Sequence, residues 1–264
     1  KSGAVNFSEY IPYQYVDELE ADGNFTVYEG YDIYNYIRLN VNRAPMDNKL
    51  VRQALNYAVD RDMVINLAFG GRGVPTTAGL VPPDDPVWYQ PSLDGHWNYD
   101  PAKALALLAE AGYENPADLK FTLECSSEPN HLDSAQIIVE TWRALGIDAN
   151  LLPLESAVRV DKSYSGDYTI MFDGAANPWT DPDFYSQYIA SEGPVYAAGI
   201  GFSDPEIDRL LAKGRAELDQ EARKAIYLEV ETLMLDIAPF VFLNFRPQAE
   251  ACASNVKGYV RVPG

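Results

Sequence analysis

The sequence predicts an α/β protein in which helices cover a mostly parallel sheet. Between residues 119 and 173, stretches with the alternating apolar pattern of strands take turns with helical stretches, in the order strand, helix, strand, helix, strand. The chain is also long and apolar enough to bury a substantial core, because 47% of its 264 residues are hydrophobic and 12% are aromatic.

The first part of the chain contains strand-like stretches followed by the strongest helical pattern. We expect a short strand, a helix over 12–21 and strands over 25–29 and 31–39, because β-forming residues alternate there. Within 48–71 an apolar face recurs at helical spacing, and Asp60 is placed to cap a second helix over 61–69 that ends at Gly70 and Gly71. The apolar positions of the first helix are Val51, Ala54, Leu55, Ala58 and Val59.

Residues 72–99 form a long loop rich in proline, glycine and aromatic residues. It contains Trp88, His96 and Trp97, and we expect the tryptophan rings to pack in the core, with a stacking platform for a ligand as the alternative. Loops of this length in a compact domain are usually functional.

Regular elements resume at Asp100, which caps a helix with Pro101 in its first turn and Gly112 at its end. The elements that follow are a strand over 119–125, a polar turn over 126–130, a helix over 132–145, a strand over 147–154 and a short helix over 156–164.

The stretch from Gly166 to Ala190 is built like the floor of a ligand crevice. Its alternating strand stops at Asp173 and Gly174, and a loop of small residues then leads past Trp179 into a helix. In α/β sheets, ligands sit beyond the carboxyl ends of the strands. Trp179 is therefore expected to be a partly exposed stacking platform, with burial in the core as the alternative.

The last part of the chain is predicted to be two helices and two strands. The helices cover 204–218 and 219–237, with Asp219 as a cap, and the strands cover 239–245 and 257–262.

Composition excludes several functional classes. The net charge of −19, from 20 basic and 39 acidic side chains, repels nucleic acids and anionic membranes. No apolar run of about 18 residues exists, so we expect no membrane insertion. We also expect no signal peptide at Lys1, and both chain ends look like cuts within a larger protein. Cys125 and Cys252 are either two core thiols or one disulfide.

The sequence does not indicate an enzyme or a metal site. The motifs of serine hydrolases, zinc peptidases and nucleotide-binding loops are absent, and His96 and His131 are isolated, which predicts surface or loop positions for both. Asp181 and Asp183 are interpreted mainly as helix caps beside Pro182. The alternative is a glycoside hydrolase that uses Asp181 or Asp183 together with Glu128.

Several stretches together resemble one family. They are APMDNKLVRQALNYAVDRDMVINLAFGGRGVPTTAGLVPP, NYDPAKALALLAEAGY, the loop over 166–185, FSDPEIDRLLAKGRAELDQEARKAIYLEVETLMLDIAPFVFL and NVKGYV. The chain is similar to the C-terminal half of the family 5 extracellular solute-binding proteins, which include the oligopeptide-, dipeptide- and nickel-binding components of ATP-binding-cassette importers.

The resemblance implies a lobe of a periplasmic-binding-protein type II fold. Residues 1–40 would belong to or cross from a second lobe, 41–246 would form the ligand-binding lobe, and 247–264 would return toward the second lobe. It also implies that the lobes close around a solute and dock on a membrane permease. The location would be periplasmic or extracellular, or lipid-anchored through an absent N-terminus. No cofactor is implied.

The resemblance places the ligand on four segments, which are the loop over 174–179, the turn over 126–130, the loop over 73–78 and residues 245–246. The expected roles are stacking by Trp179, hydrogen bonding by Asn177, Ser126, Ser127 and Asn130, and close backbone approach at Gly73 and Gly174. Arg246 would meet an anionic ligand group or pair with acidic surface residues. The remaining expected contacts are Ala175, Asp181 and Pro75.

The ligand loop departs from the peptide-binding pattern. Where such members carry a tryptophan and then an aspartate for the peptide ammonium, this chain has Ala175 and Asn177-Pro178, with Asp173 or Asp181 as substitutes. A peptide is the expected solute, and an oligosaccharide or another non-peptide solute is the alternative. The sequence does not distinguish a role in transport from a role as the partner lobe of a chemoreceptor or of a chaperone-like protein.

Overall fold

The computed structural model describes residues 6–9, 11–79, 81–83, 85–176 and 181–261. Within them, seven strands form one sheet in the order β1-β7-β2-β6-β4-β5, and β3 pairs with β7 outside this path. The strands are β1 (Phe7–Ser8), β2 (Phe25–Leu39), β3 (Val74–Pro75), β4 (Lys120–Ser126), β5 (Asp148–Leu154), β6 (Ile170–Ala176) and β7 (Phe240–Ala253).

The sheet is mixed. β4 runs parallel to β5 and β6, and the helices that connect these strands cover them, as the strand–helix order predicts. β2 is antiparallel to β6 and β7, and β7 is antiparallel to β1 and β3. The α/β class is therefore confirmed, but the expectation of a mostly parallel sheet holds only for β5, β4 and β6.

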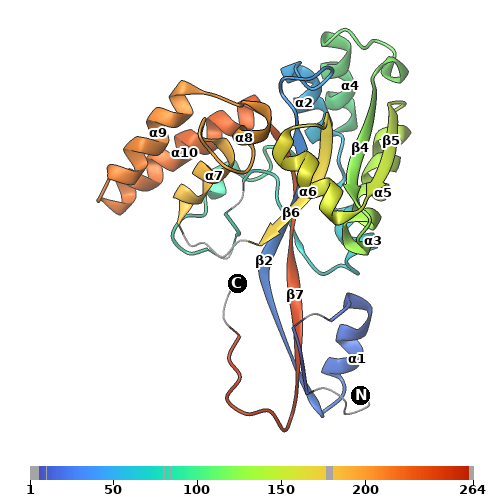
Figure 1. Cartoon of the computed structure of the whole chain (residues 1–264), viewed down its shortest axis with the longest axis vertical. Helices are drawn as coiled ribbons and strands as arrows, with labels where there is room; N and C mark the ends of the chain where they lie inside the picture. Colours follow the sequence, from blue (N-terminus) through green and yellow to red (C-terminus); the bar gives the residue numbers. More distant parts are fainter. Residues whose placement is uncertain (1–5, 10, 80, 84, 177–180, 262–264) are drawn as a thin grey trace.

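β2 and β7 form a long two-stranded ribbon that extends away from the helices (Figure 1). β2 is one strand where two were expected, because β7 pairs with it on both sides of Gly30. β7 continues eight residues beyond the expected end at Phe245. Arg72 ties the ribbon to α1 (Val16–Glu20), because its guanidinium contacts Asp17 and lies 2.8 Å from the Glu29 carboxylate.

The helices begin largely where the capping pattern predicts. The side chains of Asp60, Asp100 and Asp219 each accept a hydrogen bond at 2.9 Å from the backbone N–H three residues later. The remaining α-helices are α2 (Lys49–Tyr57), α3 (Arg61–Ala68), α4 (Pro101–Glu110), α5 (Pro129–Ala144), α6 (Ser156–Ser165), α7 (Ser186–Ile189), α8 (Ala197–Ile200), α9 (Pro205–Ala216) and α10 (Gln220–Ile237). Single 3₁₀ turns form η1 (Tyr13–Tyr15), η2 (Pro91–Leu93), η3 (Pro116–Asp118) and η4 (Pro182–Tyr185).

The two faces of the sheet bury two separate cores. On β2, Ile37 and Leu39 pack toward α2–α5, whereas Tyr34 and Tyr36 pack toward α7–α10. This follows from the strand geometry, in which successive side chains point to opposite faces. Figure 1 shows the two groups of helices on opposite sides of the sheet.

Other expectations at the level of elements have mixed outcomes. The loop over 72–99 is confirmed as largely irregular, and Trp97 in it is 2% exposed. Cys125 and Cys252 are free, buried thiols. Two expected boundaries and one expected strand were wrong. α5 begins at Pro129, so Asn130 lies in its first turn, β6 continues to Ala176, and 257–261 contain no strand.

Candidate functional site

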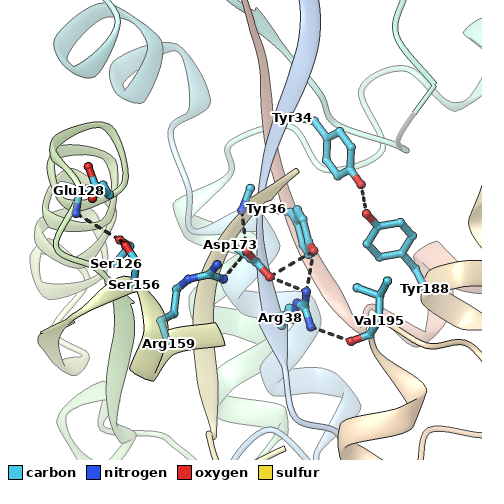
Figure 2. Close-up of polar contacts among 11 residues, drawn as sticks. Tyr34, Tyr36, Arg38, Ser126, Glu128, Ser156, Arg159, Asp173, Tyr188 and Val195 are labelled. Carbon is cyan, nitrogen blue, oxygen red and sulfur yellow. Dashed lines mark hydrogen bonds and ion pairs between the residues drawn. The ribbon is translucent and has the colours of Figure 1, made fainter. Parts of the chain in front are cut away.

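Asp173 is held between two arginines where β6 pairs with β2 (Figure 2). Its Oδ2 lies 2.5 Å from Nη2 of Arg38, and its Oδ1 lies 2.5 Å from Nη1 of Arg159 on α6. The carboxylate is 3% exposed, and its Oδ1 also accepts a hydrogen bond from the Gly174 N–H at 2.9 Å. Both oxygens are thus occupied within the protein, so Asp173 does not have a free carboxylate for a ligand ammonium.

Arg38 connects this carboxylate to the aromatic core. Its guanidinium donates to the Tyr36 hydroxyl at 3.1 Å and to the Val195 carbonyl at 2.8 Å. Burial lowers the pKa of Arg38, but Tyr36 and Asp173 raise it more, so its pKa is above the ordinary value and the charge is retained. Tyr34 and Tyr188 share a hydrogen bond in the same core, and burial raises the pKa of Tyr34.

On the opposite face of β6, Gly174 lies against α5. A Cβ atom at this position would be 2.9 Å from Oδ1 of Asn35 and 3.0 Å from Nε2 of His131. The absence of a side chain at Gly174 thus admits the side chains of β2 and α5, and the expected approach of a ligand to Gly174 stays a prediction.

His131 is one of the site residues that sequence reasoning missed. It lies in the first turn of α5, and burial together with Arg246 and Arg159 lowers its pKa to about 4, although Asp173 opposes this. The ring packs against Phe172, with 5.2 Å between centroids. His131 is half-buried and lies in a helix, so the expected surface or loop position holds only in part, whereas His96 is exposed in its loop, as expected.

A cavity of about 380 Å³ opens between the start of α5 and β7. It brings together Asn130 and Arg246, two of the residues expected to bind ligand. Among the described residues, its lining consists of Pro12, Glu128, Pro129, Asn130, His131 and Arg246. Arg246 is 8% exposed and donates from Nη1 to the Tyr13 hydroxyl at 3.1 Å.

The loop at Gly73 lies beside the same strand. β3 pairs Val74 with Phe245 and Pro75 with Asn244, the two β7 residues that precede Arg246. Gly73 has φ +152°, and a Cβ atom there would be 3.0 Å from the Phe245 carbonyl oxygen. The backbone of Gly73 thus lies close to the backbone of β7.

Ser126 and Ser127 end β4 but differ in exposure. The buried Ser126 hydroxyl lies 3.0 Å from that of Ser156 and accepts the Glu128 N–H at 3.2 Å (Figure 2). Ser127 is exposed, and its N–H donates to the Leu154 carbonyl at 2.8 Å. The Ser126 side chain therefore shapes the turn before α5.

Asp181 does not line this cavity and pairs instead with α10. Both of its oxygens lie 2.7 Å from the Arg223 guanidinium, and Oδ1 also accepts the Asp183 N–H at 2.9 Å, so the predicted capping role is confirmed. Asp183 pairs with Arg215 at 2.8 Å. These partners occupy the carboxylates that the glycoside-hydrolase alternative would need.

The remaining expected contacts are only partly described. Ala175 pairs with Tyr34 of β2. Asn177 and Trp179, with their expected hydrogen-bonding and stacking roles, lie outside the described residues. Among the described residues, no group of three or more metal-ligating side chains is found. No helix in the described parts of the chain is long and apolar enough to span a membrane.

Comparison with protein families gives one match over most of the chain. A model described as "Bacterial extracellular solute-binding proteins, family 5 Middle" matches residues 1–197.

Curated relatives and solved structures agree with this match. Heme-binding protein A of Haemophilus influenzae is 31% identical over 232 residues, which are 86% of this chain and 42% of that protein. Glutathione-binding protein GsiB of Escherichia coli K12 is 28% identical over 276 residues, which are 100% of this chain and 52% of that protein. The chain thus spans about half the length of these curated relatives.

Two solved structures have the same fold. AgaA from A. tumefaciens R10, in complex with agropinic acid, matches with a TM-score of 0.89 at 30% identity, over 100% of this chain and 54% of that one. DppA from Helicobacter pylori, in complex with the peptide STSA, matches with a TM-score of 0.85 at 26% identity, over 98% of this chain and 50% of that one.

Proposed function

Since the chain belongs to the bacterial extracellular solute-binding proteins of family 5, we propose that it is a ligand-binding lobe of the solute-capture component of an ATP-binding-cassette importer. In this proposal the lobe binds a peptide or a similar small solute and delivers it to a membrane permease without chemical turnover. The family is extracellular or periplasmic, and lipid anchoring of this member is part of the proposal.

The cavity between α5 and β7 is the observation that carries the proposal. It lies at the carboxyl end of β4, where ligands bind in α/β sheets, and its volume of about 380 Å³ is in the range of small-molecule sites. Arg246 and Asn130 supply polar groups to a wall that otherwise includes two prolines.

The long ribbon of β2 and β7 supports the proposal of a second lobe. Both strands leave the helix-covered part of the sheet side by side (Figure 1), as expected of segments that cross between two bodies. We propose that 1–40 and 247–264 belong to this connection and that 41–246 form the lobe. A second lobe would then close the open side of the cavity, as in hinge-type closure.

Ligand screening by thermal shift tests the proposal. The whole protein that carries this chain would be heated with pools of dipeptides to pentapeptides, oligosaccharides and amino-acid conjugates. A ligand present at about 100 times its Kd stabilises the native state by about 2.7 kcal/mol, so a rise in Tm is expected with the peptide pools. Release of a hydrolysis product at catalytic protein concentration would count against a role in binding alone.

A further inference from the structure

We propose that a groove between α3 and α5 is a docking surface for an amphipathic helix of a partner protein, one that presents an apolar stripe flanked by basic side chains. The groove has a volume of about 530 Å³ and shares no described residue with the ligand cavity. It is formed by helices on the side of the sheet away from α7–α10 (Figure 1). The proposal therefore goes beyond the proposed function and does not depend on the solute.

The floor of the groove is apolar and open to solvent. α3 contributes Met63 and Leu67, about one helical turn apart, which are 42% and 69% exposed. Tyr99 is 44% exposed, and α5 adds the half-buried Ile137 and the exposed Ala144. Exposed apolar side chains that gather in one place mark interaction sites, whereas singly scattered ones do not.

The walls of the groove suit a third helix. Six residues of α5 line it at positions i, i+3, i+4, i+7, i+8 and i+11 from Asp133, which is one helix face over about three turns, or about 16 Å. α3 packs against α5 and forms the other wall. Both walls pair their backbone groups within helices, so the groove offers no strand edge, and an amphipathic helix laid into it is the fitting mode of recognition.

The rim of the groove is acidic. Of the described residues that line it, those charged at neutral pH are Asp133 and Glu140, and both are exposed. Asp133 has no ion-pair partner among the described residues. Glu140 lies 2.7 Å from Arg143 in an exposed position, where an ion pair contributes little. Basic side chains on both flanks of an apolar stripe would therefore complement this rim.

The charge pattern argues against two other occupants of an apolar groove. A second copy of this chain would bring like charges together, because each copy carries the same rim and a net charge of −19. An anionic membrane is repelled for the same reason. A basic helix is attracted instead, which raises its rate of encounter, and its apolar side chains would fill the groove.

Synthetic peptides test the proposal on the whole protein that carries this chain. The probe is a capped peptide of about 18 residues with leucines on one helix face and lysines on both flanks. One companion peptide has glutamates in place of the lysines, and a second keeps the lysines but scatters the leucines around the helix. Calorimetry is expected to show that the probe binds at least tenfold more tightly than either companion. Equal binding of the scattered peptide would contradict the proposal, because charge alone would then explain the attraction.

Matched substitutions locate the binding in the groove. Leu67→Ser should weaken binding of the probe at least tenfold, whereas Leu218→Ser, at a side chain that is 97% exposed elsewhere, should leave it unchanged. Asp133→Asn should weaken binding about threefold and reduce its dependence on salt. Glu229→Gln on the exposed side of α10 changes the net charge equally and should do neither. All four side chains are exposed, so the variants should fold, and equal losses in the control variants would overturn the proposal.

Two further measurements test the other occupants. A dimer of the unchanged protein in sedimentation that is lost in Leu67→Ser would assign the groove to a second copy and refute the proposal. Binding to phosphatidylcholine vesicles that is lost in the same variant would assign it to a membrane surface, with the same consequence. The rise in Tm with solute should be equal in Leu67→Ser and the unchanged protein, so failure of this proposal and failure of the proposed function are separate results.

Discussion

Asp173 joins three elements at the scale of single residues. Its carboxylate pairs with Arg38 of β2 and Arg159 of α6, and the Asp173–Arg38 pair is almost fully buried. A buried pair that loses one partner leaves an uncompensated charge in a medium of low polarity. The arrangement of β2, β6 and α6 around Asp173 therefore depends more on the charge of its carboxylate than on the shape of its side chain.

Substitution of Asp173 by asparagine tests this dependence. Asp173→Asn keeps the shape but removes the charge between the two guanidinium groups, so we expect the free energy of unfolding to fall by about 3 kcal/mol. Arg159→Gln should cost less than half as much, because Arg159 is the more exposed partner. Urea denaturation of the three proteins measures both effects, and a loss below about 1 kcal/mol for Asp173→Asn would contradict the argument.

Glu231 predicts a pH dependence of stability. It is 3% exposed, and burial raises its pKa from 4.5 to about 7, although a hydrogen bond from Tyr185 at 2.7 Å opposes the rise. The folded protein thus holds a proton that the unfolded chain releases between these two values. Stability from this group is full below about pH 4.5 and is lost as the pH rises toward 7.

Glu231→Gln should remove this dependence, because glutamine can still accept the Tyr185 hydrogen bond. Between pH 5 and pH 8, the unchanged protein should lose on the order of 2 kcal/mol more stability than the variant. Urea denaturation at the two pH values is the measurement. Glu229→Gln on the exposed side of α10 serves as the control, and an equal pH dependence in Glu231→Gln would exclude Glu231 as its source.

At the scale of elements, single side chains fix where helices begin. The Asp60 carboxylate accepts the Met63 N–H at 2.9 Å at the start of α3, and this bond satisfies a donor that the helix itself leaves free. We expect Asp60→Ala to lower the free energy of unfolding by about 1 kcal/mol. Asp62→Ala in the first turn of the same helix should cost less, and chemical denaturation of the pair would show whether capping accounts for the difference.

The element order could be predicted largely because its signals are local. Caps such as Asp60 and Asp100 can be recognised from a few neighbouring residues, and so can the alternation of apolar and polar residues in a strand. The length of β2 could not be predicted, because Gly30 resembles a break and only pairing with the distant β7 continues the strand.

The cavity was predicted only in part, for a similar reason. Asn130 and Arg246 follow strand-like stretches and were named from the sequence, but they meet across 116 positions of the chain. His131 was missed because an isolated histidine gives no sign of its burial. The apolar spacing of the helix that follows it was the one available signal, and it placed the helix start too late.

At the scale of the whole molecule, the lobe presents only one wall of the proposed cleft. We expect the isolated chain to bind its solute more than about tenfold more weakly than the whole protein, a difference of about 1.4 kcal/mol in binding free energy. Calorimetry on both proteins with the same solute measures the ratio. Equal affinities would mean that this lobe forms the complete site by itself.

The pairing of β2 with β7 shifts register between Gly30 and Ile33, opposite Pro247. Proline has no N–H to donate, so the ladder is interrupted there, and the ribbon can bend at this point with the loss of few hydrogen bonds. Arg246 is the residue directly before this pivot. A bend of the ribbon at this point would therefore lie one residue from a side chain that lines the cavity.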